Sequence, residues 1–184
     1  ALYLPNLGGV ERFTYNLAKK LLARGDQVTV VTSNVQGIQE YEKTEGIEVF
    51  RMPCFSLLGG RFPVIKKNGA YRKLEKQLKT IPCDFVIVNT RYYLHSLFGV
   101  KFAKKRGVPC ITIEHGTSHL SIESPLFDRL GQWFEHFLTS RIRKYCHHFY
   151  GVSQNCCRWL THFGIKPEGT VYNAIDLDQI QSYL

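Results

Sequence analysis

Short apolar runs alternate along this chain with longer segments that carry apolar residues at helical spacing. The runs 27–32, 84–89 and 108–113 are mostly apolar and rich in β-branched residues, which is typical of strands covered on both faces. The segments 10–24 and 93–106 instead repeat apolar residues every three or four positions, which predicts amphipathic helices. This alternation predicts an α/β fold with a Rossmann-like, doubly wound and mainly parallel sheet of about six to seven strands.

The remaining segments fit the same alternation, and the 184 residues suffice for one ordinary domain with a sizeable core. We expect further strands at 1–4, 47–51, 147–152 and 169–172, and further helices at 64–80, 124–145 and 154–163. Residues 55–63 include Gly59-Gly60 and end at a proline, so we expect an exposed loop there.

A parallel sheet of this kind binds its ligands beyond the carboxyl ends of its strands. Residues at those ends are therefore the candidates for a site. They are Gly8, Gly9, Asn89, Thr90, Arg91, His115, Gly116, Ser153 and Asn173.

Gly8 and Gly9 follow the first apolar run and lead directly into a helical segment. This order brings backbone N–H groups and a helix N-terminus to one point, which favours binding of a phosphate group. The spacing matches neither the G-x-G-x-x-G fingerprint nor a P-loop, so a plain tight turn is an equal alternative.

His115 is the strongest single candidate for chemistry, since it follows a predicted strand and precedes Gly116. One ring nitrogen can meet a sugar hydroxyl while a backbone carbonyl holds the other, although a purely structural histidine is the alternative. Glu114 should point to the opposite side of the extended chain, and we assign it no catalysis. We judge that no H-x-x-x-H pair makes a metal site, the sequence contains no G-x-S-x-G elbow and no C-x-x-C pair, and we expect no bound metal.

The formal net charge is +9, and six of the basic residues lie in the segment 64–80. Solvated helix faces explain much of this charge, while nucleic acid, an anionic membrane and an anionic substrate are the functional alternatives. No apolar run reaches the roughly 18–20 residues that span a bilayer. The six cysteines form no recognisable disulfide framework, which favours reduced thiols and a cytoplasmic location.

Several separate segments match one family. The segment GGVERFTYNLAKKLLARGDQVTVVT resembles the opening of glycosyltransferase family 4, the retaining, nucleotide-sugar-dependent group with the GT-B fold. GIEVFRMP, DFVIVNT, GVPCITIEHG, YGVSQ and VYNAID resemble the later motifs of that family, in the expected order. Two departures are Asp26, where a histidine is usual, and Tyr172-Asn173-Ala174, where the family has Pro-Asn-Gly.

The resemblance implies roles for individual residues. Gly8 and Gly9 match the loop beside the donor diphosphate, and His115 matches the cleft histidine that contacts the transferred sugar or the acceptor. Ser153 and Asn173 match the motifs after the sixth strand and before the domain crossing. With Thr90, Arg91 and Gly116, these residues form the expected donor and substrate site.

The resemblance also implies a domain organisation. Residues 1–172 correspond to the N-terminal, acceptor-side Rossmann-like domain and 173–184 to the start of the interdomain crossing, with the donor-binding domain absent from this chain. The implied function is transfer of a sugar, as a hexosyltransferase, to a glycan or lipid-linked acceptor in polysaccharide or glycolipid synthesis. No cofactor or metal is implied, the nucleotide-sugar is a co-substrate, and we expect this chain alone to be inactive.

The implied partners are a nucleotide-sugar, a glycan or lipid-linked acceptor, and an anionic membrane surface that the segment 64–80 contacts from the cytoplasmic side.

A non-catalytic sugar- or nucleotide-binding module is the main alternative to this function. A nicotinamide-dependent oxidoreductase fits the fold but lacks the glycine fingerprint, and Thr32-Ser33-Asn34 stands where its acidic ribose ligand would be. No motif supports nucleic-acid binding.

Overall fold

A computed structural model of the chain describes residues 2–121 and 123–173. The described strands are β1 (Thr29–Asn34), β2 (Tyr41–Thr44), β3 (Ile47–Leu57), β4 (Phe62–Ile65), β5 (Val86–Asn89), β6 (Cys110–Glu114), β7 (His148–Gly151) and β8 (Gly169–Thr170). The described helices are α1 (Gly9–Ala23), α2 (Gly69–Thr80), α3 (Leu94–Arg106), α4 (Pro125–Arg143) and α5 (Gln154–His162), with a short 3₁₀ turn η1 at Leu58–Gly60.

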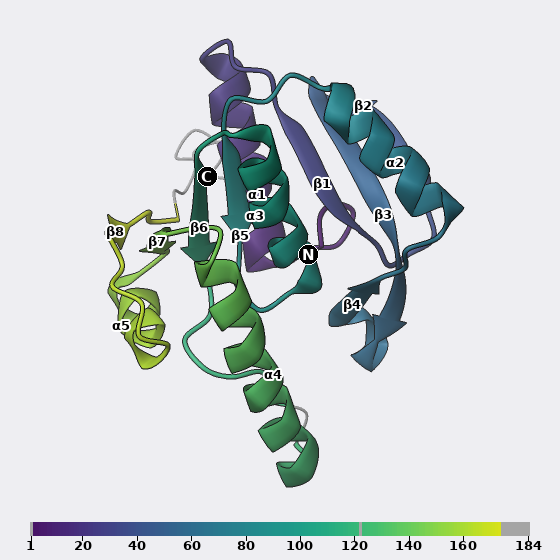
Figure 1. The fold of residues 1–184 in the computed structure, drawn as a ribbon. Helices are drawn as coiled ribbons and strands as arrows, with labels where there is room; N and C mark the ends of the chain where they lie inside the picture. The colour runs from purple at the N-terminus through teal and green to yellow at the C-terminus, as the bar shows by residue number, and fades with distance from the viewer. Residues whose placement is uncertain (1, 122, 174–184) are drawn as a thin grey trace, which may run out of the picture.

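The strands form two sheets (Figure 1). In the first, β1 pairs with β3 in parallel, while β2 and β4 run antiparallel to β3. In the second, β5, β6, β7 and β8 are all parallel and stand in that order. The predicted α/β, Rossmann-like fold class is confirmed.

Alternate residues of the first sheet pack against helices on opposite faces, as double winding requires. Val30 and Val49 share a core cluster with Ala18 of α1. Their neighbour Phe50 instead packs with Leu74 of α2 and with aromatic residues of α3. One strand therefore contributes to two cores, because successive side chains point to opposite faces.

Helix α3 connects the two sheets. Phe98 packs with the core beneath α2, whereas Val100 belongs to the core of the second sheet. A buried polar contact adds to this link, since Ser33 Oγ at the end of β1 lies 3.1 Å from His95 Nδ1 on α3. The packing of α3 thus holds β1 and β5 in one domain although they do not pair.

The prediction of a strand at 1–4 is wrong for the residues that the structure describes. Residues 2–4 carry no strand pairing, and Tyr3 is instead buried against α1 and β1. An apolar run predicts burial, but a strand also needs a neighbouring backbone to pair with.

The predicted loop at 55–63 and the start of the predicted helix at 64 are also wrong. Strand β3 continues to Leu57, turns through η1 and returns as β4, so the segment is a β-hairpin. Gly59 and Gly60 have φ values of 62° and 87°, and this left-handed conformation reverses the chain. Helix α2 begins only at Gly69, where the Asn68 side chain accepts a hydrogen bond of 3.0 Å from Tyr71 N.

The carboxyl ends of the second sheet lie at one edge, as predicted. Asn89 of β5 is in register with Ile113 of β6, and Glu114 is in register with Gly151 of β7. Gly151 also pairs with Thr170 of β8. A Cβ on Gly151 would lie 2.7 Å from Cys157 N, so this glycine allows α5 to begin directly against the strand end.

Two further predictions concern thiols and membranes. All six cysteines are free thiols in the structure. Among the described residues, no helix has both the length and the apolar character needed to cross a bilayer. The expected start of a domain crossing at 173–184 falls, from residue 174 onward, outside the described residues.

Candidate functional site

The N-terminus of α1 forms one side of the candidate site. Gly8 is its N-cap residue and no side chain caps the first turn, in which Gly9 is exposed and Glu11 is buried. A Cβ on Gly8 would overlap the Glu11 carboxylate, which folds back toward the helix start. A Cβ on Gly9 would meet no protein atom within 4 Å, so the space beside this glycine is open to an approaching ligand.

His115 lies immediately beyond β6 and beside α1. Its ring meets the Phe13 ring edge-on, with centroids 4.9 Å apart. Its Nε2 lies 2.9 Å from Oδ1 of Asn89, the last residue of β5. The sequence predicted a backbone carbonyl as the group that orients this ring, but the structure uses a side-chain amide from the neighbouring strand.

The hydrogen bonds around Asn89 determine where the His115 proton lies. Thr14 Oγ1 donates to Val10 O at 2.7 Å, so it accepts from Asn89 Nδ2 at 3.0 Å. Asn89 Oδ1 therefore faces His115 and accepts from Nε2–H. Nδ1 is left as the acceptor nitrogen, and among the described residues no protein group donates to it.

Burial lowers the pKa of His115 to about 4. The imidazole is therefore neutral near pH 7, in the tautomer that accepts a hydrogen bond at Nδ1. A neutral acceptor held in one orientation suits a hydroxyl donor such as a sugar O–H.

A buried ion-pair network stabilises the loop that carries His115. Glu114 Oε1 accepts hydrogen bonds from the backbone N–H groups of His115 (3.0 Å) and Gly116 (2.8 Å). Its other oxygen lies 3.2 Å from Arg91 Nε, and Arg91 Nη1 lies 2.6 Å from Glu135 Oε1. Burial raises the pKa of Glu114, and the nearby Arg91 guanidinium opposes that rise. Glu114 thus positions the loop that carries His115.

Arg91 was expected to contact substrate, and the structure gives its side chain a different environment. It is fully buried, lies between Glu114 and Glu135, and its Cζ is 3.6 Å from the centroid of the Phe163 ring. The buried guanidinium therefore stabilises the loop that carries His115, through its ion pair with Glu114.

Thr90, Ser153 and Asn173 lie at the edge but differ in what their side chains do. Thr90 is buried with φ of 61°, an unfavourable conformation for a β-branched residue, and its Oγ1 donates to Asn89 O. Ser153 caps α5 by accepting from Cys156 N at 3.2 Å. Asn173 is exposed beyond β8. Helix α1, which begins at Gly9, contacts His115 through Phe13.

An open concavity of about 370 Å³ lies next to the His115 loop. It is lined by Thr117, Asn155, Arg158 and Trp159. These side chains offer a hydroxyl, an amide, a guanidinium and an indole, groups that bind sugars and anions by hydrogen bonding and stacking. Sequence reasoning missed this surface, because its residues come from a loop and from one face of α5 with no motif to mark them.

Comparison with known proteins adds two findings. A sequence model described as Glycosyltransferase Family 4 matches residues 7–179. An uncharacterized glycosyltransferase of Methanocaldococcus jannaschii is 22% identical over 187 residues, which cover 98% of this chain and 47% of that protein. The chain therefore spans about half the length of this curated relative.

Proposed function

This chain belongs to glycosyltransferase family 4, and from that premise we propose that it is the N-terminal, acceptor-side domain of a retaining, nucleotide-sugar-dependent glycosyltransferase. The complete enzyme transfers a hexose to a glycan or lipid-linked acceptor. The donor nucleotide binds mainly to a second domain, and the cleft between the domains holds the reacting groups.

The geometry of His115 carries this proposal. Its ring is neutral, its Nε2–H is bound to Asn89, and its Nδ1 is available at the carboxyl edge of a parallel sheet. The uncapped start of α1 lies on the same side, since Phe13 of α1 contacts the His115 ring. This arrangement supports the proposal that one edge binds both a sugar hydroxyl, at His115 Nδ1, and a diphosphate, at the start of α1.

The contribution of this domain to catalysis is electrostatic stabilisation and orientation, rather than a covalent bond to the substrate. The helix N-terminus at Gly8–Gly9 stabilises negative charge that develops on the leaving diphosphate, while His115 orients the sugar or the acceptor. Transfer on this scheme requires no bound metal. Closure of a second domain over the edge would exclude water and complete the set of phosphate ligands.

The test compares this 184-residue chain with the complete protein across a panel of nucleotide-sugars and glycan acceptors. We expect transfer by the complete protein, with NMR showing retained anomeric configuration in the product, and no turnover by the chain alone. Turnover by the chain alone would contradict the proposal that transfer requires a second, donor-binding domain. Donor binding without transfer by the complete protein would instead favour a non-catalytic binding module.

We further propose that a membrane carries the acceptor and that this domain contacts it. The sequence pointed to the segment 64–80, where Lys66, Lys67, Arg72, Lys73, Lys76 and Lys79 are all exposed. The adjoining β3–β4 hairpin adds exposed apolar side chains, and Lys66 Nζ lies 5.3 Å from the centroid of the Phe55 ring. Basic and apolar groups side by side are typical of an interfacial surface.

Helix α4 extends this surface. Its N-terminal half projects from the body of the domain (Figure 1), and it touches the hairpin where the Phe62 and Phe134 rings lie 5.7 Å apart. The helix exposes large apolar side chains at Leu126, Phe127, Leu130, Trp133 and Phe137.

Flotation with liposomes tests this surface. Vesicles containing anionic lipid should bind the protein, and replacing Lys66, Lys67, Lys76 and Lys79 by glutamine should weaken partitioning about fivefold per charge, since each basic residue contributes about 1 kcal/mol. Phe127→Ser with Trp133→Ser should also weaken it. Lys104→Gln with Lys105→Gln on α3 is the control and should bind as the unchanged protein does. Equal binding to neutral vesicles would reject the proposed role of the basic residues, and no binding to either kind of vesicle would reject the membrane contact.

A further inference from the structure

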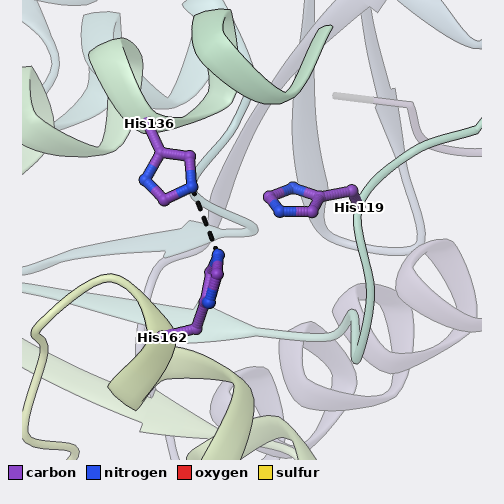
Figure 2. Close-up of side chains that lie close together, drawn as sticks. All are labelled: His119, His136 and His162. Carbon is purple, nitrogen blue, oxygen red and sulfur yellow. Dashed lines mark hydrogen bonds between the residues drawn. The ribbon is translucent and has the colours of Figure 1, made fainter. Parts of the chain in front are cut away.

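Three histidines that are far apart in the sequence converge at one place on the molecule (Figure 2). His119 lies in the loop after β6, His136 lies on α4, and His162 is the last residue of α5. One ring nitrogen from each lies within 4.8 Å of the nitrogens offered by the other two. The proposed transfer chemistry uses none of them.

The spacing between two of these rings is already that of metal ligands. His136 Nε2 and His162 Nε2 are 3.2 Å apart. Two nitrogen ligands on one tetrahedral zinc ion lie about 3.3 Å apart, because each Zn–N bond is about 2.0–2.1 Å long. A metal ion can therefore take the place of the single proton that these two nitrogens share.

The third ring carries the support that is typical of a metal-bound histidine. His119 Nδ1 lies 2.5 Å from Glu135 Oε2, and the other Glu135 oxygen is held by Arg91. A carboxylate on one ring nitrogen fixes the tautomer and directs the other nitrogen, here Nε2, toward the metal. Glu135 is itself buried, so the carboxylate that orients His119 is held in a fixed position.

Aromatic packing holds the rings in these orientations. The His162 ring stacks on Trp159 with centroids 4.8 Å apart and planes 5° from parallel. The His119 ring meets Trp159 edge-on at 4.8 Å, and the His136 ring lies 4.6 Å from Phe163. A site held by packing loses little freedom when an ion binds.

We infer that His119, His136 and His162 bind one divalent transition-metal ion, for which Zn²⁺ is the best fit. Three neutral imidazoles suit Zn²⁺, and a water molecule would complete a tetrahedral shell. His136 and His162 are exposed, so the ion can enter from solvent. The bound ion would join the loop after β6 to α4 and α5.

The test uses the chain without an affinity tag, dialysed first against a chelator. Zn²⁺ is then titrated in competition with a chromophoric chelator, and bound metal is measured by mass spectrometry. We expect one Zn²⁺ per chain, and Co²⁺ in its place should give the visible absorption bands of a tetrahedral site. His136→Gln and His162→Gln should each weaken binding by about 100-fold or more, beyond the 10–100-fold effect of losing an outer-shell partner.

A thermal readout separates binding at this site from adventitious binding. At a Zn²⁺ concentration about 100 times Kd, Tm should rise by about 5–10 °C, and neither variant should show the rise. His147→Gln changes an exposed histidine outside the cluster and should keep both the affinity and the rise. Absence of stoichiometric Zn²⁺, or equal affinity in His136→Gln, His162→Gln and the unchanged chain, would overturn the inference.

Discussion

Replacing Arg91 by methionine should lower the free energy of unfolding by about 3–5 kcal/mol at pH 7, the usual consequence of removing one partner from a buried ion pair. Arg91 is fully buried between Glu114 and Glu135, and both carboxylates are buried as well. Methionine fills much of the same volume but leaves the two carboxylates without a cation. Chemical denaturation of the two proteins at pH 7 measures the loss.

The loss should become smaller as the pH falls toward 5. Burial already raises the pKa of Glu114 above its ordinary value, and removing Arg91 removes the main influence that lowers it. A carboxyl group whose pKa is raised on folding stabilises the fold at low pH, and that stability is lost as pH rises through the folded-state pKa. The variant should therefore recover stability relative to the unchanged protein on acidification.

Two comparisons sharpen this prediction. Arg72→Met removes an exposed guanidinium from α2 and should change stability by less than about 0.5 kcal/mol. Adding Glu114→Gln and Glu135→Gln to Arg91→Met should recover part of the loss, because no buried charge then remains unpaired. An equal loss in the Arg72 and Arg91 variants, or a loss that grows at pH 5, would contradict the buried-network interpretation.

Replacing His115 by alanine should lower kcat/KM of the complete enzyme on the order of 10²-fold, as expected for removal of a preorganised hydrogen-bonding group beside the reacting centre. His115 Nδ1 is the acceptor that the hydrogen bonds around Asn89 leave free. The measurement is steady-state sugar transfer at pH 7, with circular dichroism to check that the variant is folded. His148→Gln, an exposed histidine on β7, is the matched control.

The pH profile tests the same residue in a second way. The pKa of His115 is lowered by burial to about 4, so its neutral form persists from pH 5 to 8 and its contribution to kcat/KM should be constant there. Asn89→Asp places a carboxylate against Nε2–H, which favours the imidazolium and raises that pKa. Because the imidazolium has no acceptor nitrogen, kcat/KM of this variant should fall as pH falls through the new pKa. An unchanged kcat/KM in His115→Ala would assign the histidine a structural role only.

The alternation of apolar runs and helical segments was enough to predict the fold class and the sheet edge where His115 lies. Each element buries one face or both, and the spacing of apolar residues within the element shows which face is buried. The same reasoning failed for residues 2–4 and 55–65. Strand pairing there depends on which backbone lies alongside, and local apolarity does not report it.

The chemistry of individual side chains depended on contacts between residues far apart in the chain. Arg91 lies just after β5, which is the position expected for a residue that contacts a ligand. Its side chain is nevertheless in the interior, because it contacts Glu135 and Phe163, both distant in sequence. Asn89 fixes the His115 tautomer because β5 and β6 are adjacent.

Thus the sequence determined which segments are buried, the α/β alternation and the family. The tertiary structure alone decided which polar groups meet: the neutral histidine at the edge, the buried cation beneath it, and the three histidines that converge beside α5. The physical reason is that periodicity reflects the exposure of each element separately. Hydrogen bonds, ion pairs and metal sites depend instead on distances of a few ångströms between elements, which only their packing sets.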